Sequence, residues 1–538
     1  MPAHLNVYDY IVMGAYMGAT LLLGVWVSRS GMKTSKDYFL GGRSLPWYVV
    51  GGSMVATDIS SEHFIANVGA AYKYGVVVAA GAWNTWIVYT LLIWVFLPYY
   101  FRTGLTTMPE FLQRRYSRAC RYIFAFFLIV GYIVAIIGGT LYSGGLALES
   151  IFGVELKTGI LFFAVTTAAY TIYGGLKSAA WTDFMQMVLL LITGLLVPAL
   201  ALAHAGSLRP VIEAAPEKFQ VFLPPTHKPF PFTGVFTGFL TVGIWYSCTS
   251  QHIVQRVLSA KDEWHARMGV VSAGLLRIIT PLFFVLPGLA AFKLFPNLDR
   301  PDQAYLMLVT NFVPTGLKGL ILAGLSAALM STLSTVVNST SSLLTLDLYQ
   351  QLRPASSEAR KLRFGRWSSA VVFVLGVVIA FGFAASPDTP LFVQVQNVFF
   401  WIAPPFAVVF TLGILWRRAN TTAAVTTIIS GFAFTGLLDQ VLFPKIALLI
   451  PYNTYLHRAL LAWGFCMIVM IVTSLVTAPP PAAKTEGIIW SWRYAALPAA
   501  EQARYRGWRD YRIWWLVFVG SVLAIYSYFI WRRIQHPW

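Results

Sequence analysis

The chain has 538 residues, of which 57% are hydrophobic and only 11% are charged, and its formal net charge is +18. Soluble domains carry about 25% charged residues, so this composition excludes an ordinary soluble protein and indicates that most of the chain lies in a lipid bilayer. The positive charge does not indicate nucleic-acid binding, because the basic residues lie in short segments between apolar runs, where they report membrane topology. The three cysteines, Cys120, Cys248 and Cys466, are too far apart to suggest a disulfide framework or a metal site.

Apolar runs of roughly 20 residues, the length that crosses a bilayer as an α-helix, recur about fourteen times along the chain. The first run has no basic segment before it and no small-residue cleavage site after it, so we expect a retained helix and not a signal peptide. The predicted fold class is an all-α polytopic membrane protein with about 14 transmembrane helices in one membrane domain, residues 1–538. The approximate helix cores are 9–28, 46–69, 79–101, 120–150, 157–175, 182–204, 233–256, 268–292, 316–346, 367–385, 391–416, 421–441, 456–477 and 512–531.

Lysine and arginine gather in every second loop, and this bias places those loops on the cytoplasmic side. An even number of spans then puts both termini on the extracytoplasmic side of a plasma (inner) membrane. Arg532 and Arg533 do not fit this pattern, because they lie near the C-terminus on the outer side. Residues 205–232 predict an external loop, and residues 478–510 predict a cytoplasmic linker. The basic residues assigned to the cytoplasmic side are Arg29, Lys33, Lys36, Arg43, Arg102, Arg114, Arg115, Arg118, Arg121, Arg256, Lys261, Arg267, Arg353, Arg360, Lys361, Arg363, Arg366, Arg417, Arg418, Arg493, Arg504, Arg506 and Arg509.

The most informative stretch is Ser53–Phe64, which carries Asp58, Glu62 and His63 inside a long apolar segment. An ionisable side chain at membrane depth costs a few kcal/mol at least. Irregular backbone at that depth is tolerated only where it lines a pathway or is buried in protein. We therefore expect a helix that opens here and exposes polar backbone to a cavity. The alternative is a polar helix end at the membrane surface, which the apolar residues on both sides disfavour.

Further polar groups lie inside later apolar runs. Asp183, in Trp181-Thr-Asp183, is either an N-cap at the membrane surface or a buried carboxylate. The stretch Trp245–Gln251 is polar and aromatic within an apolar run. Arg277 lies about a third of the way into its span, so we expect it to need a partner or an anion, and Gln396 is also at membrane depth. The sequence shows no catalytic, zinc or phosphate-loop motif, so an enzyme is not predicted.

Hydroxyl side chains are concentrated between Ala327 and Ser342. At helical spacing they lie on adjacent faces of one helix, and hydroxyl and carbonyl oxygens suit a hard cation. Serine and threonine also pack membrane helices together, and for this cluster alone that reading is favoured. Beside an opened helix, however, the cluster predicts a Na⁺ site, because transporters build such sites in this way. The hydroxyls concerned are those of Ser331, Thr332, Ser334 and Thr335.

At these residues the chain resembles the sodium/solute symporter family, and within it the sodium–glucose cotransporter branch. The resemblance extends from Asp37 to about Arg418 and implies a leucine-transporter-type inverted repeat of five plus five helices. Repeat one is expected over 46–204 and repeat two over 233–416, with an extra first helix at 9–28 and additional helices over 421–531. The matching motifs are Asp37-Tyr-Phe-Leu-Gly-Gly-Arg-Ser, Thr107-Met-Pro-Glu-Phe-Leu, Tyr173-Gly-Gly-Leu, Trp181-Thr-Asp, Ile253-Val-Gln-Arg-Val-Leu-Ser-Ala-Lys and Asn338-Ser-Thr-Ser-Ser-Leu-Leu-Thr-Leu-Asp-Leu-Tyr.

The resemblance implies two sets of Na⁺ ligands. The main Na⁺ site would use the carbonyls of Ala56, Ile59 and Ala328 and the hydroxyls of Ser331 and Thr332. A possible second Na⁺ site would use Asp183, Ser334 and Thr335.

The resemblance also implies positions that contact the solute, with Tyr246 as the aromatic inner gate. Here the chain departs from the sugar transporters: Asp58 replaces an asparagine, Arg277 a lysine, Ala82 a glutamate and Ser247 an aromatic residue. Asp58 and Arg277 are therefore expected to pair in the cavity or to bind a substrate with its own charges. The expected solute-binding residues are Asp58, His63, Trp83, Thr85, Tyr246, Arg277 and Gln396.

These features together predict a Na⁺-coupled secondary symporter that imports a small polar organic solute by alternating access. A sugar or sugar derivative is the first expectation for the solute. The alternative within transport is a symporter of an organic anion or amino acid, and the alternative of another class is a membrane solute sensor. Sensors of that kind usually carry a cytoplasmic output domain, for which residues 478–510 leave no room.

Overall fold

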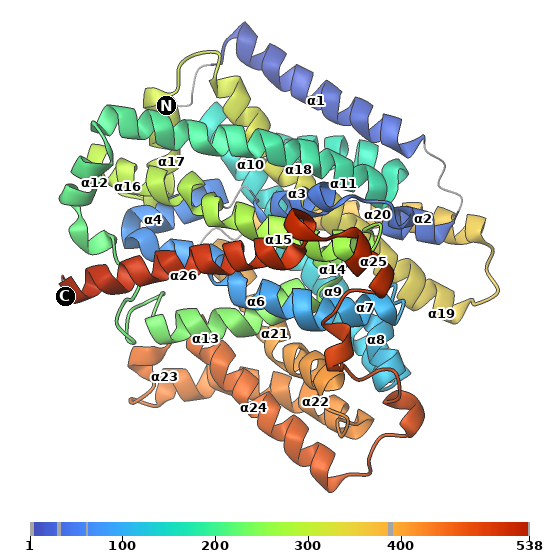
Figure 1. The fold of residues 1–538 in the computed structure, drawn as a ribbon. Helices are drawn as coiled ribbons and strands as arrows, with labels where there is room; N and C mark the ends of the chain where they lie inside the picture. Colours follow the sequence, from blue (N-terminus) through green and yellow to red (C-terminus); the bar gives the residue numbers. More distant parts are fainter. Residues whose placement is uncertain (1–4, 30–33, 61–62, 386–390, 536–538) are drawn as a thin grey trace.

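The computed structural model describes residues 5–29, 34–60, 63–385 and 391–535, and for residues 150, 151 and 391–397 only the backbone. Within these ranges the regular structure is helical (Figure 1). Eleven helices or helical runs in the described ranges are long and apolar enough to cross a membrane: Val7–Ser28, His63–Arg102, Arg118–Glu149, Leu156–Ala205, Glu263–Leu294, Lys318–Leu352, Glu358–Ala384, Val398–Leu415, Thr421–Lys445, Tyr455–Val476 and Tyr511–Gln535.

The α-helices are α1 (Val7–Ser28), α2 (Ser35–Leu40), α3 (Trp47–Asp58), α4 (Val68–Tyr74), α5 (Ala80–Trp83), α6 (Thr85–Leu91), α7 (Leu97–Arg102), α8 (Met108–Arg115), α9 (Arg118–Gly131), α10 (Gly139–Phe152), α11 (Leu156–Ala205), α12 (Leu208–Ala214), α13 (Phe232–Gly243), α14 (Gln251–Leu258), α15 (Glu263–Ile279), α16 (Val285–Leu294), α17 (Ala304–Phe312), α18 (Lys318–Ser342), α19 (Gln350–Leu352), α20 (Glu358–Ala384), α21 (Leu391–Leu415), α22 (Thr421–Leu437), α23 (Phe443–Lys445), α24 (Tyr455–Val476), α25 (Ala499–Arg504) and α26 (Tyr511–Gln535). Segments of π-helix lie at His63–Asn67, Leu92–Phe96, Tyr132–Gly138, Ile244–Thr249, Leu343–Tyr349 and Leu438–Leu442. Short 3₁₀ turns lie at Gly41–Arg43, Gly75–Ala79, Pro216–Lys218, Thr280–Phe283, Pro301–Gln303, Ile450–Tyr452, Ala482–Lys484, Trp492–Tyr494 and Gly507–Arg509.

Local capping signals explain where many of these helices begin. Asn6 and Thr34 each form a capping box with an aspartate three residues later, which satisfies the first free amides of α1 and α2. Asp262, Asn420 and Thr454 accept the same kind of bond at the starts of α15, α22 and α24. The runs between these caps are largely apolar, and a helix satisfies the hydrogen bonds of its own backbone. These runs can therefore lie in the bilayer.

The predicted count of about fourteen spans differs from the eleven observed because two predicted spans are interrupted and two others are joined into one helix. The run predicted at 46–69 is broken after α3, which has only 12 residues. The runs predicted at 157–175 and 182–204 form one 50-residue helix, α11, with a non-helical backbone at Gly175 (φ 57°). The run predicted at 233–256 is divided into α13 and α14.

Two of these interruptions occupy corresponding places in the two predicted repeats. The first helix of repeat one, α3, ends at Asp58, and Ile59 is extended (φ −93°, ψ 104°). The first helix of repeat two ends in the π-segment Ile244–Thr249, and Ser250 is extended (φ −80°, ψ 139°) before α14. Interrupted helices at matching positions of two halves are the pattern that marks a transporter's binding site. The predicted opening of the helix within Ser53–Phe64 is therefore present, although Glu62 lies outside the described residues.

Both ends of the chain lie on the same side of the molecule. Figure 1 shows the start of α1 and the end of α26 on the left, and α2, α19 and α25 on the right. The arginines that did not fit the charge bias contact the segment predicted as an external loop. Arg533 donates to the carbonyl of Phe222 (3.0 Å), and the Arg532 guanidinium lies 5.3 Å from the centre of the Phe219 ring.

Residues 478–510, predicted as a linker, form an ordered strap across the right-hand end of the molecule in Figure 1. Arg102 of α7 donates to the carbonyls of Arg493 and Ala496, and Arg267 of α15 donates to that of Tyr494. The Arg267 guanidinium is buried and needs acceptors, and the backbone of the strap supplies them.

Several arginines predicted to lie in cytoplasmic loops are buried. Arg115, Arg256 and Arg267 have no solvent-accessible surface, and Arg121 is 6% exposed. Each has oxygen partners within the fold, such as the carbonyl of Gly413 for Arg115 and the carboxylate of Asp347 for Arg121. Their charge is thus balanced by groups that are distant in the sequence.

Candidate functional site

The broken helix α3 and the hydroxyl-rich helix α18 meet in the interior of the molecule. The Thr332 hydroxyl donates to the carbonyl of Thr57 (3.1 Å). The hydroxyls of Thr57 and Thr335 share a hydrogen bond of 3.0 Å. The two sequence features that together predicted a cation site are therefore in direct contact.

The end of α3 leaves the Ala56 carbonyl without its ordinary helical partner. In a continued helix the amide of Ser60 would bond that carbonyl. Instead the Ser60 amide donates to Nδ1 of His63 (3.2 Å). The break thus frees a backbone oxygen at the position predicted for a Na⁺ ligand.

All five residues predicted for the main Na⁺ site are buried: Ala56, Ile59, Ala328, Ser331 and Thr332. The Ser331 hydroxyl donates to Oδ1 of Asp183 (2.8 Å), and the Thr332 hydroxyl donates to Thr57. A hydroxyl that donates its proton elsewhere keeps oxygen lone pairs for a cation. Carbonyl and hydroxyl oxygens fit Na⁺, which would be held there by these five residues.

Asp183 lies in the interior of α11, far from a helix end, so the N-cap interpretation was wrong. Its carboxylate forms an ion pair with Arg256 of α14, with 2.7 Å between Oδ2 and Nη2. Ser53 of α3 donates to the same carboxylate oxygen (2.7 Å). Together with Ser331, this network ties α3, α11, α14 and α18 together beside the predicted Na⁺ ligands.

The residues of the possible second Na⁺ site are only partly brought together. Arg256 donates to Asp183 and to the hydroxyl of Thr335, so a guanidinium lies where the second cation was predicted. The Ser334 hydroxyl donates to the carbonyl of Ser331 (3.0 Å). A second Na⁺ at these three residues would require Arg256 to move.

A cavity of about 220 Å³ lies next to the break in α3. Five residues predicted to contact solute line it: Asp58, His63, Thr85, Tyr246 and Arg277. Thr332 of the predicted Na⁺ site also lines it, so the cavity and that site share a wall. Phe399 and Phe239 supply apolar surface around these polar groups.

Asp58 and Arg277 form an ion pair in this cavity, as predicted from the sequence. The Tyr89 hydroxyl donates to the same oxygen of Asp58, Oδ2 (3.2 Å). Two buried atoms of the pair, Oδ1 of Asp58 and Nε of Arg277, have no hydrogen-bond partner within the described part of the chain. A buried acceptor and a buried donor without partners are costly unless a ligand satisfies them.

A second cavity of about 190 Å³ also borders the ion pair. It shares Asp58, His63 and Arg277 with the first cavity, and adds Phe284 and Tyr455. The ion pair therefore lines both cavities.

One residue predicted to contact solute, Trp83, is placed elsewhere. Trp83 is outside the lining of both cavities, and its ring packs against Tyr526 and Phe529 of α26. Trp83 follows Ala82 in the sequence, but successive side chains of a helix point about 100° apart. The two residues therefore lie on different faces of the helix. The side chain of Gln396 lies outside the described residues.

Sequence reasoning missed two residues that line or support the cavity, Asn84 and Tyr89. Asn84 lines the cavity, donates to the carbonyl of Val235 (2.8 Å) and accepts from the Tyr526 hydroxyl (2.6 Å). The signal that could have identified Asn84 is the presence of an asparagine inside an apolar run. Tyr89 carried no such signal, because tyrosine is ordinary in membrane helices.

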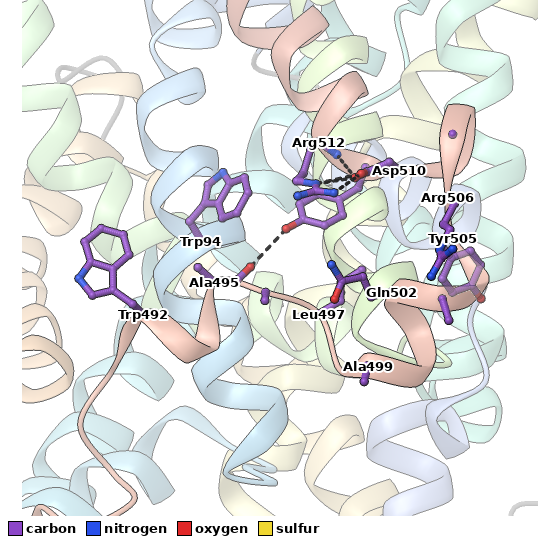
Figure 2. Close-up of a pocket in the computed structure, with 14 residues that line it drawn as sticks. Trp94, Trp492, Ala495, Leu497, Ala499, Gln502, Tyr505, Arg506, Asp510 and Arg512 are labelled. Atoms are coloured by element: carbon purple, nitrogen blue, oxygen red, sulfur yellow. Dashed lines mark hydrogen bonds and ion pairs between the residues drawn. The ribbon is translucent and has the colours of Figure 1, made fainter.

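The largest cavity described, about 880 Å³, is not this site. It is formed mainly by the strap, and Figure 2 shows Trp94, Ala495 and Arg506 around it, with Asp510 and Arg512 paired at its edge. None of the residues predicted to contact solute or Na⁺ is among those that line it.

Comparison with known proteins places the chain among cation-coupled transporters. A model of the sodium:solute symporter family matches residues 38–431. The sodium/glucose cotransporter of Vibrio parahaemolyticus is 32% identical over 88% of this chain and 91% of its own length. The human sodium/myo-inositol cotransporter 2 is 30% identical over 92% of this chain and 80% of its own length.

A solved structure confirms the predicted fold class. The outward-open, substrate-bound structure of a Na⁺-coupled sialic acid symporter superposes with a TM-score of 0.80. It covers 88% of this chain and 98% of its own, at 23% sequence identity. The fold is thus of the leucine-transporter type, and its division into an inverted repeat of five plus five helices stays a prediction.

Proposed function

The chain belongs to the sodium:solute symporter family, and we propose that it imports a neutral polyhydroxylated solute, a sugar or sugar derivative, together with Na⁺. It is a multi-pass membrane protein, and Na⁺ is the coupling ion of its family. The relatives are transporters, and we propose that this chain likewise catalyses no chemical reaction.

One observation carries the proposed solute class. Asp58 and Arg277 line the cavity, and an acceptor of the pair, Asp58 Oδ1, and a donor, Arg277 Nε, have no hydrogen-bond partner among the described residues. A hydroxyl group donates and accepts, so two neighbouring hydroxyls of a sugar satisfy both atoms. An organic anion would instead have to compete with Asp58 for Arg277, and the net charge of the pair is zero. The relatives named above are cotransporters of glucose and myo-inositol, which supports a neutral solute.

The proposed mechanism is alternating access. Na⁺ at the carbonyls of Ala56, Ile59 and Ala328 and the hydroxyls of Ser331 and Thr332 would hold the end of α3 against α18. Solute would then bind in the adjoining cavity, where Thr332 is shared, and the site would reopen on the other side. The membrane potential adds about 2.3 kcal/mol per charge per 100 mV.

We also propose the sidedness of the molecule. The side that carries α2, α19 and the strap would face the cytoplasm, and both termini would face outward from a plasma membrane. The contacts of Arg532 and Arg533 with residues of the 205–232 segment support this proposal, because they explain two positive charges on the outer side.

The test is uptake into proteoliposomes with Na⁺ or choline outside, after a thermal-stability screen against sugars, polyols, sugar acids and amino acids. We expect Na⁺-dependent stabilisation by neutral polyols or sugars, and uptake that stops in choline. Stabilisation by sugar acids or amino acids alone would favour the organic-anion or amino-acid alternative. Undiminished uptake in choline would contradict Na⁺ coupling.

A further inference from the structure

An apolar cavity of about 790 Å³ lies away from the solute site, between α3, α11, α15 and α26. Its walls are apolar and aromatic side chains of these helices, among them Tyr48, Phe184, Met187 and Leu275. Three of these helices belong to runs that are long and apolar enough to cross a membrane. Tyr48 is 41% exposed, so the cavity opens to the molecular surface. An apolar hollow of this kind is complementary in polarity to a lipid acyl chain.

One end of the cavity is cationic. Arg504 and Arg509 of the strap line it, and neither guanidinium forms an ion pair with any described residue. The Arg504 guanidinium rests 5.5 Å from the centre of the Tyr505 ring.

Acidic groups near this end of the cavity have other donors, and Asp510, next to Arg509 in the sequence, is paired with Arg512. Asp262 accepts from the amide of His265 (2.7 Å) and from the Tyr505 hydroxyl (3.1 Å). Glu501 accepts from the amide of Trp264 (2.8 Å). The positive charge at the mouth of the cavity is therefore not balanced by an ion pair within the described part of the chain, and it is complementary to an anion.

Aromatic side chains mark the same end as a bilayer interface. Trp264 stacks on Tyr505 with 4.0 Å between ring centres, and the Trp514 indole donates to the carbonyl of Trp508 (2.9 Å). Trp508 is 80% exposed. Tryptophan and tyrosine prefer the headgroup level of a membrane, where one part of the ring is apolar and another is wet.

We propose that this cavity binds an anionic phospholipid, with its phosphate against Arg504 and Arg509 and its acyl chains against α3, α11 and α15. Basic pockets at the ends of transmembrane helices select acidic lipid headgroups in this way. The lipid would contact α3, which carries Asp58, and α15, which carries Arg277. A lipid bound here would therefore touch the two helices that carry the ion pair of the solute cavity.

The experiment measures lipid binding to the full-length, delipidated protein in detergent by native mass spectrometry and by the thermal unfolding midpoint. The probes are dioleoylphosphatidylglycerol, dioleoylphosphatidylcholine and sn-glycerol-3-phosphate. We expect phosphatidylglycerol to bind at least tenfold more tightly than phosphatidylcholine, and glycerol phosphate to cause no shift. Arg504→Gln combined with Arg509→Gln should weaken phosphatidylglycerol binding more than tenfold, since each basic group contributes about fivefold.

Arg506→Gln is the matched control, because Arg506 is an exposed arginine of the same strap that lines the other cavity. It should change binding less than twofold. Leu275→Trp, which fills the cavity, should weaken both phospholipids and thereby test the acyl-chain part of the site. Equal binding of the two phospholipids, or an equal loss in Arg506→Gln, would overturn the proposal, and stabilisation by glycerol phosphate alone would show a phosphate site without a lipid.

Discussion

Asp183 of α11 and Arg256 of α14 form an ion pair in which neither side chain has any solvent-accessible surface, with 2.7 Å between Oδ2 and Nη2. The pair lies beside the predicted main Na⁺ site, because Ser331 donates to the other carboxylate oxygen. Removing one member of a buried pair strands the other charge.

We therefore expect Asp183→Asn and Arg256→Gln each to lower the free energy of unfolding by about 3–5 kcal/mol. The double variant should lose less than the sum of the two. Thermal unfolding in detergent provides the measurement, and Arg209→Gln, which breaks the exposed pair with Glu213, is the control. Strict additivity of the single losses would mean that the pair contributes no coupling.

The Na⁺ requirement should depend on the hydroxyls of α18. Ser331→Ala and Thr332→Ala each remove one predicted oxygen ligand, and we expect the Na⁺ concentration for half-maximal uptake to rise about tenfold, or ~1.4 kcal/mol. Ser326→Ala is the matched control, since Ser326 is buried on the same helix but lies near Met13 of α1. Unchanged Na⁺ dependence in both variants would move the cation to other ligands.

We expect one Na⁺ ion to be transported with each solute molecule. The second predicted position is filled by the Arg256 guanidinium, which donates to Asp183 and Thr335. Charge movement measured together with radiolabelled solute uptake gives the ratio. A ratio of two that falls to one in Thr335→Ala would show that Arg256 withdraws and a second Na⁺ enters.

The Asp58–Arg277 pair should behave as a unit in solute binding. We expect Asp58→Asn alone to weaken solute affinity at least tenfold, and Asp58→Asn with Arg277→Gln to weaken it less. A double-mutant cycle on the dissociation constant should give a coupling energy of about 1–3 kcal/mol. Independent effects would leave Arg277 free to hold an anionic group of the solute, in favour of the organic-anion alternative.

Tyr89 should matter more to the solute than Trp83 does. Tyr89→Phe removes a hydrogen bond to the charged Asp58, which is typically a loss of about 1.5–3 kcal/mol, so we expect about tenfold weaker solute binding. Trp83→Phe should change solute affinity less than twofold, because the ring packs on α26 outside both cavities. Isothermal titration of both variants decides this, and the reverse order would restore Trp83 to the site.

The sequence alone determined the membrane class, the fold family and the two main groups of polar residues, around Asp58 and around Ser331. Hydropathy identifies spans because a helix is one of few structures that satisfy the backbone in lipid. The polar stretch around Asp58 and the hydroxyls around Ser331 were visible because such groups are expensive at membrane depth. The pairing of Asp58 with Arg277 was predictable for the same reason: each charge required a partner.

Only the tertiary structure decided which charged side chains are buried and which groups contact each of them. Arg256 reads as a loop residue, since a solvated and a buried arginine near a helix end look alike in sequence. Its partner, Asp183, is 73 residues away, and no local pattern records that distance. The same holds for the strap, whose backbone oxygens accept from Arg102 and Arg267, and for Trp83, whose direction depends on how α26 packs. Long-range packing places these groups, whereas local chemistry only states that each of them needs a partner.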